Sequence, residues 1–158
     1  MGNLFAGSEV VELGVQIEKN GRDFYNALAD QSKNQKSKDM FTYLAGEEGK
    51  HIVAFQKILN SVQKYEPTDS YPGEYFAYMN ALAREHVFTQ KDKGAELAKG
   101  IKNDKEAIGV AMKFEEDSIV FFEGMKKVVR ETEHKVIEDL VSQEQQHVQK
   151  LLDIKKGL

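Results

Sequence analysis

The sequence predicts an all-α protein, an antiparallel four-helix bundle that forms a single domain over residues 1–158. Four stretches carry apolar side chains three and four residues apart, which is the spacing of one face of an α-helix. Short links join the first stretch to the second and the third to the fourth, so each pair should pack antiparallel. A long connection separates the two pairs, and we expect it to cross over the bundle and to be partly helical.

The first predicted helix runs from about Glu9 to Gln31, with Ser8 as its N-cap, after a loose lead-in over residues 1–7. The second runs from about Lys38 to Val62 after a polar link. Both are long enough to span a small domain, at about 1.5 Å of rise per residue.

The predicted crossover extends from about Tyr65 to Asn103 and begins with the prolines Pro67 and Pro72. Proline interrupts helical hydrogen bonding, so the long helices should stop there. Within this stretch, Glu74–His86 and Ala95–Ile101 are expected to form two short helices.

The third predicted helix begins at a capping-box-like sequence, with Asn103 as N-cap and Glu106 three residues later. It should continue to about Arg130. The fourth should run from about Glu133 to Lys156, with Gly157 at its C-terminal cap.

Two apolar seams contain the same polar pair. Glu48 and His51 lie on the seam of the second helix, and Glu144 and His147 lie on that of the fourth, 96 residues further on. A buried carboxylate needs a partner or must give up its charge. A glutamate and a histidine three residues apart on one helical face can bind one metal ion together.

Each pair is preceded by a glutamate about thirty residues upstream, so the chain contains an internal repeat of a helix pair. Two divalent cations would balance the four buried carboxylates, and such a carboxylate-rich set suits iron or manganese better than zinc or copper. The predicted metal ligands are Glu18, Glu48, His51, Glu115, Glu144 and His147.

The two remaining histidines are not expected to be ligands. His134 belongs to a third Glu-x-x-His sequence, but charged residues surround it and no glutamate precedes it by thirty, so we expect it at the surface. His86 lies in the crossover without the motif.

On these paired motifs, the chain from about Val10 to Lys156 resembles the rubrerythrin-like branch of the ferritin-like superfamily. The resemblance implies a di-iron centre, with manganese or a mixed metal pair as alternatives. It implies that Glu18 and Glu115 are terminal carboxylates, that Glu48 and Glu144 bridge the two metals, that His51 and His147 are terminal imidazoles, and that Tyr25 lies beside the site.

Two features differ from rubrerythrins proper. The chain contains no cysteine, so electrons would have to come from an external donor. Ser118 occupies the position of a further family glutamate, which makes the two ligand sets nearly equivalent. The leading hypothesis is a di-iron oxidoreductase that reduces hydrogen peroxide or dioxygen. The alternatives are an iron-oxidising storage protein of the ferritin type and a non-enzymatic, metal-dependent sensor.

Composition excludes other classes of function. A net charge of −4 and a pI near 5.6 argue against nucleic-acid binding. No apolar run reaches the roughly 20 residues of a membrane span, and no signal peptide is evident, so the cytoplasm is the expected location. The repeated pairs and the long crossover favour a homodimer, in which helix pairs could be exchanged.

Overall fold

The computed structural model describes residues 4, 6–65 and 72–158, and every regular element in these ranges is a helix. The predicted lead-in at residues 1–3 and 5, and the crossover residues 66–71 with Pro67, lie outside the described residues. The four long helices are α1 (Gly7–Gln31), α2 (Gln35–Tyr65), α5 (Asp104–Met125) and α6 (Glu131–Lys156). The predicted all-α, four-helix architecture is confirmed.

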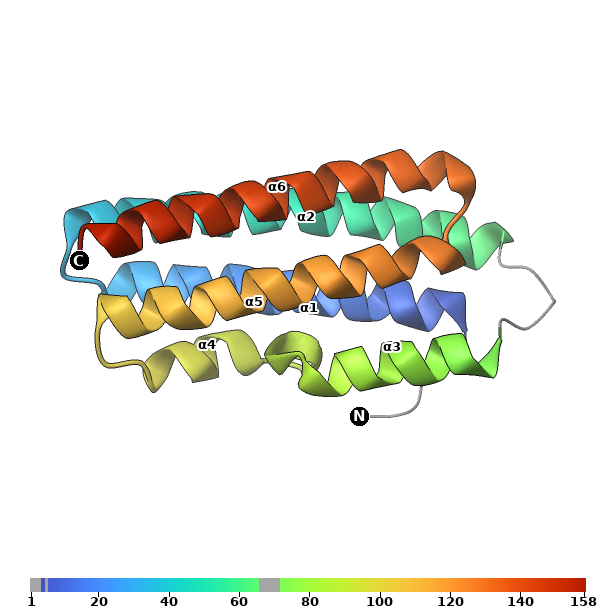
Figure 1. The fold of residues 1–158 in the computed structure, drawn as a ribbon, viewed down its shortest axis with the longest axis horizontal. Helices are drawn as coiled ribbons and strands as arrows, with labels where there is room; N and C mark the ends of the chain where they lie inside the picture. The colour runs from blue at the N-terminus through green and yellow to red at the C-terminus, as the bar shows by residue number, and fades with distance from the viewer. Residues whose placement is uncertain (1–3, 5, 66–71) are drawn as a thin grey trace.

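The crossover lies on one side of the bundle (Figure 1). Helix α6 runs along α2, while α3 (Gly73–Glu85), the 3₁₀ turn η1 (Val87–Thr89) and α4 (Lys93–Lys99) run along α1 and α5. The crossover is therefore partly helical, as predicted. Aromatic side chains fill the space between these layers; those with 0% exposure include Phe24, Tyr25, Phe55, Phe88, Phe114, Phe121 and Phe122.

The first two helices begin earlier than predicted. Ala6, not Ser8, is the N-cap of α1, and its carbonyl accepts hydrogen bonds from the backbone N–H groups of Glu9 and Val10. Helix α2 begins at Gln35 because Asn34 Oδ1 accepts a hydrogen bond from the backbone N–H of Ser37, at 3.1 Å. Asparagine is among the preferred capping residues, so this start was readable from the sequence.

The prediction that the third helix continues to Arg130 is wrong. Helix α5 ends at Met125, and a 3₁₀ turn, η2 (Lys126–Val128), tightens the chain before α6 begins at Glu131. His134 Nε2 donates to the carbonyl of Lys126 at 2.8 Å, which satisfies a group that the end of α5 leaves free.

The cap predicted at Asn103 is present, since its Oδ1 accepts from the N–H of Glu106 at 2.8 Å. The reciprocal bond differs, because Glu106 Oε2 accepts from Lys102 rather than from Asn103. Gly157 is the C-cap of α6, but its φ of −91° is open to any residue.

Asn20 fastens the crossover to α1. Its Nδ2 donates to the carbonyls of Phe88 and Gln90, and its Oδ1 accepts from the N–H groups of Lys93 and Gly94. A Cβ on Gly94 would lie 2.0 Å from the Asn20 carbonyl oxygen, so only glycine permits this approach of α4. Helix α4 begins two residues earlier than predicted, where these bonds hold it.

Among the described residues, no helix is long and apolar enough to cross a membrane.

Candidate metal centre

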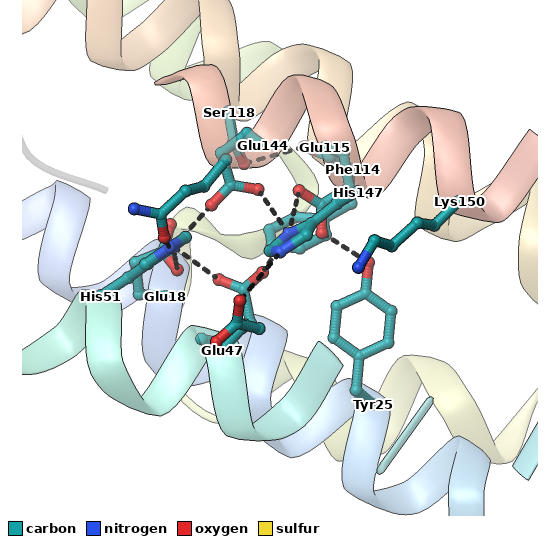
Figure 2. A network of polar contacts seen from close by, with 12 residues as sticks. Glu18, Tyr25, Glu47, His51, Phe114, Glu115, Ser118, Glu144, His147 and Lys150 are labelled. Atoms are coloured by element: carbon teal, nitrogen blue, oxygen red, sulfur yellow. Dashed lines mark hydrogen bonds and ion pairs between the residues drawn. The ribbon is translucent and has the colours of Figure 1, made fainter. Parts of the chain in front are cut away.

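The structure brings all six predicted ligands together between the four long helices. Helices α1 and α5 each supply one glutamate, Glu18 and Glu115, while α2 and α6 each supply a glutamate and a histidine. The four carboxylates are 0% exposed and the two imidazoles 1%. Figure 2 labels Glu18, His51, Glu115, Glu144 and His147, and these side chains point toward one another. One chain therefore contains every residue of the cluster.

The six side chains form two overlapping groups, in each of which the candidate ligand atoms lie within 4.8 Å of one another. Both groups contain Glu48 and Glu144, so these two carboxylates lie between the groups. The groups are Glu18, Glu48, His51 and Glu144, and Glu48, Glu115, Glu144 and His147.

Both imidazoles turn Nδ1 toward the carboxylates. His51 Nδ1 lies 2.7 Å from Glu144 Oε1 and 3.4 Å from Glu18 Oε2. His147 Nδ1 lies 3.5 Å from both Glu115 Oε2 and Glu144 Oε2. The two rings are nearly parallel, at 15° with centroids 5.8 Å apart. Nδ1 is therefore the atom that each histidine offers to the centre.

The cluster contains most of the unsatisfied polar atoms of the described core. Ten buried side-chain oxygen and nitrogen atoms of these six residues lack a hydrogen-bond partner, and among the described residues only Ser37 Oγ shares this condition. Even the 2.7 Å contact between His51 and Glu144 lacks hydrogen-bond geometry. Buried polar groups are almost always paired, so an arrangement in which they converge without pairing fits a bound cation.

Without a cation, the cluster shares its protons unevenly. Burial, and then the neighbouring charge of Glu144, raise the pKa of Glu18 to about 7. Burial also opposes ionisation of Glu144, but contacts with His147 and His51 outweigh it and lower the pKa of that carboxyl. Burial likewise opposes the charged form of His51, yet Glu144 and Glu18 raise its pKa to about 11. In the metal-free chain, Glu18 and His51 thus retain their protons to a higher pH than usual.

Tyr25 lies beside the cluster. Its hydroxyl donates to Glu115 Oε1 at 2.6 Å, while Glu115 Oε2 has no partner. Burial, with the charges of Glu144 and Glu18, raises the pKa of Tyr25 well above its usual range, so the hydroxyl stays protonated. The tyrosine thus fixes one oxygen of Glu115 and leaves the other turned to the centre.

His86 is a buried neighbour that the sequence did not reveal. The backbone N–H of Phe88 donates to its Nδ1 at 3.1 Å, so its Nε2 carries the proton and donates to Ser118 Oγ at 2.9 Å. Ser118 in turn donates to the carbonyl of Phe114. Burial lowers the pKa of His86 to about 4, which keeps it neutral. His86 also lines a pocket of about 630 Å³ between α3 and α4.

The Nε2 atoms of the two clustered histidines face different partners. His51 Nε2 donates to Gln143 Oε1 at 2.8 Å. His147 Nε2 lies 4.0 Å from Glu47 Oε1. Neither partner was singled out from the sequence, although each directly precedes a clustered glutamate. His134, predicted at the surface, is part-buried at the start of α6 and belongs to neither group.

Comparison with known proteins identifies the class. The chain superposes on a protein from Thermotoga maritima described as a ferritin-like diiron-carboxylate protein, with a TM-score of 0.72 and 21% identity over 99% of this chain and 98% of that one. The fold is thus a ferritin-like helical bundle. A family model described as Rubrerythrin matches residues 9–155, and the chain belongs to the rubrerythrin family. No curated protein matches the chain.

Proposed function

We propose that the chain binds two iron ions and reduces hydrogen peroxide, or dioxygen, with electrons from an external donor. The observation that carries the proposal is the convergence of unpaired polar atoms in one buried cluster: of the ten, all but His147 Nε2, which faces Glu47, belong to the carboxylates or are the Nδ1 atoms that face them. Two divalent ions would balance the four carboxylates, and a set of four carboxylates and two imidazoles suits iron, with manganese or a mixed pair as the next candidates.

The arrangement of the two groups supports particular roles for their residues. Glu48 and Glu144 belong to both groups and would be shared by the two ions. Glu18 and Glu115 belong to one group each and are its terminal carboxylates. His51 and His147 bind through Nδ1, the atom that faces the carboxylates.

When bound, two ferrous ions supply the two electrons that, with two protons, reduce one peroxide to two waters. The chain's own residues prepare the site for this chemistry. Complete burial excludes bulk water from the cluster. Tyr25 holds Glu115 in place and keeps a proton at its hydroxyl beside the centre. The proposal takes the electrons from an external donor, because these 158 residues include no cysteine that could hold a redox-active iron.

The test is peroxide consumption by iron-loaded protein with a chemical reductant, together with iron analysis. We expect about two irons per chain and turnover well above that of free iron. Glu115→Gln should lose metal and turnover, whereas Glu116→Gln, exposed one residue further along α5, should keep both. A rate no higher than that of free iron would overturn the proposed reaction.

Iron storage and metal-dependent sensing remain the competing hypotheses for the same site. A cage of many subunits in size-exclusion chromatography would favour storage, whereas we propose a homodimer. Exchange of helix pairs is not needed to complete the cluster, because one chain supplies all six residues. A monomer in light scattering at micromolar concentration would exclude the dimer.

A further inference from the structure

The two metal-binding groups look equivalent when only their ligands are considered. Each contains a terminal glutamate, a histidine and the same two shared glutamates. The sequence repeat maps one histidine onto the other, since His147 follows His51 by 96 residues. Glu47 and Gln143 are also 96 residues apart, and each precedes a shared glutamate.

These two repeat positions act across the bundle. Glu47 on α2 faces the Nε2 atom of His147 on α6, and Gln143 on α6 faces the Nε2 atom of His51 on α2. The placement is mutual but the contacts differ. The amide of Gln143 accepts a hydrogen bond from His51 Nε2 at 2.8 Å, whereas the carboxylate of Glu47 lies 4.0 Å from His147 Nε2 without a hydrogen bond and acts through its charge. A carboxylate beside the outer nitrogen of a metal-binding imidazole makes the inner nitrogen a stronger donor, and a neutral amide does so less.

The surroundings of Glu47 hold it as an anion. Lys50 Nζ lies 3.1 Å from its Oε2, and the Tyr43 hydroxyl donates to its Oε1 at 3.0 Å. Lys150 Nζ donates to the same tyrosine hydroxyl and lies 4.3 Å from the ring centroid. These neighbours of Glu47 are not repeated in the second half of the chain, where Asp139 corresponds to Tyr43 and Gln146 corresponds to Lys50.

One interaction should weaken, rather than strengthen, metal binding by the group that contains His147. Tyr25 donates to Glu115, which belongs to the same group as His147, and so draws electron density from that carboxylate. The bond is made to Oε1, however, and Oε2 is the atom left for a metal. The neutral hydroxyl acts on the carboxylate oxygen that does not face the metal position. It should therefore change the metal affinity less than the full charge of Glu47 beside the imidazole.

We propose that Glu47 makes the two metal positions unequal, so that the position with His147 binds ferrous iron first and more tightly than the position with His51. Glu47 is a positioning residue in this proposal, because it acts through His147. The inference rests on the proposed function only in that both positions hold iron; it does not require peroxide turnover.

The experiment is an anaerobic titration of the metal-free chain with ferrous iron against a chromogenic chelator. The wild-type chain should bind in two resolved steps. Glu47→Gln gives both imidazoles an amide partner, and Gln143→Glu gives both a carboxylate, so each should narrow the ratio of the two affinities by about tenfold. The double variant Glu47→Gln/Gln143→Glu exchanges the partners and should restore the wild-type ratio. A merely structural role would not produce this reversal.

Further variants assign the steps and control for charge. Glu115→Gln should remove the tighter step and Glu18→Gln the weaker one. Gln145→Glu adds the same charge at an exposed site on α6 and should leave both steps unchanged. If the single variants keep the wild-type ratio, or the double variant fails to restore it, the inference is overturned. A wild-type stoichiometry below two would instead overturn the proposed function.

Discussion

The two helix pairs, α1–α2 and α5–α6, carry the same ligands but surround them differently. Glu18 corresponds to Glu115 at a separation of 97 residues, and Glu48 to Glu144 at 96. In the first pair, however, the side chain of Asn20 makes four hydrogen bonds to the crossover. Its counterpart Asp117, 97 residues later, pairs with Lys113 at the surface. Repetition therefore preserved the ligands, and the differences serve the single crossover.

A second difference lies on the seam beside the terminal glutamates. Gly21 corresponds to Ser118, and a Cβ at Gly21 would lie 2.5 Å from the ring of Phe114. Ser118 instead accepts a hydrogen bond from His86 of the crossover. Tyr25 corresponds to Phe122, so only one half supplies a hydroxyl to a terminal glutamate. The two halves are thus alike in ligands and unlike in what holds those ligands in place.

The largest expected effect tests the shared element. Glu48→Gln and Glu144→Gln each remove a carboxylate common to both groups, so either variant should lower bound iron from about two per chain to below one. Elemental analysis after reconstitution measures this, with Glu116→Gln as the matched control. Full loading of both variants would show that the two groups share no carboxylate.

Asn20→Ala tests how much the attachment of the crossover to α1 contributes to the free energy of unfolding. It leaves buried carbonyls and amides of the crossover without partners, which should cost about 3 kcal/mol in the free energy of unfolding. Asn26→Ala, on the exposed face of the same helix, should change it by no more than about 0.5 kcal/mol. Urea denaturation measures the free energy of unfolding of both variants. Equal losses in Asn20→Ala and Asn26→Ala would contradict the proposal that Asn20 holds the crossover against α1.

Tyr25→Phe makes the first half like the second at this position. Loss of the hydrogen bond to Glu115 should cost about 2 kcal/mol in the metal-free chain. Tyr78→Phe, at a half-exposed tyrosine of α3, serves as control and should be nearly neutral. A Tyr25→Phe chain as stable as wild type would mean that the hydroxyl does not hold Glu115.

The last comparison concerns the pH dependence of stability. The folded-state pKa of Glu18 is raised from 4.5 to about 7, so its stabilisation is lost as pH rises through that range. The pKa of His86 is lowered from 6.5 to about 4, so its stabilisation is lost as pH falls through that range. In the metal-free chain these slopes oppose one another between about pH 4.5 and 6.5.

Two variants separate the slopes. In Glu18→Gln, stability should rise with pH across this window, and in His86→Gln it should fall. Above about pH 7 the metal-free wild type should lose stability, because the pKa of His51 is raised to about 11. Iron loading should reverse the contribution of Glu18, since the cation binds its ionised form. Thermal melts across pH measure all four curves; parallel curves with and without iron would contradict a shared site.

The sequence alone determined the four long helices and the six clustered residues. Helical periodicity is a local property, so a polar residue on an apolar seam can be recognised from its near neighbours. The exact repetition of Glu48 and His51 at Glu144 and His147 then made the cluster specific. Helix ends were less well predicted, as at Arg130, because the turn between α5 and α6 depends on what His134 contacts.

Tertiary structure alone decided how the remaining polar residues are used. Asn20 meets the crossover 68 to 74 residues away, and His51 meets Gln143 at a separation of 92. A buried polar group must find a partner, but this requirement does not say which one. The sequence places His86 only in the crossover. In the structure it is a neutral imidazole that donates a hydrogen bond to Ser118. Glu47 likewise acquired its place beside His147 only when α2 packed against α6.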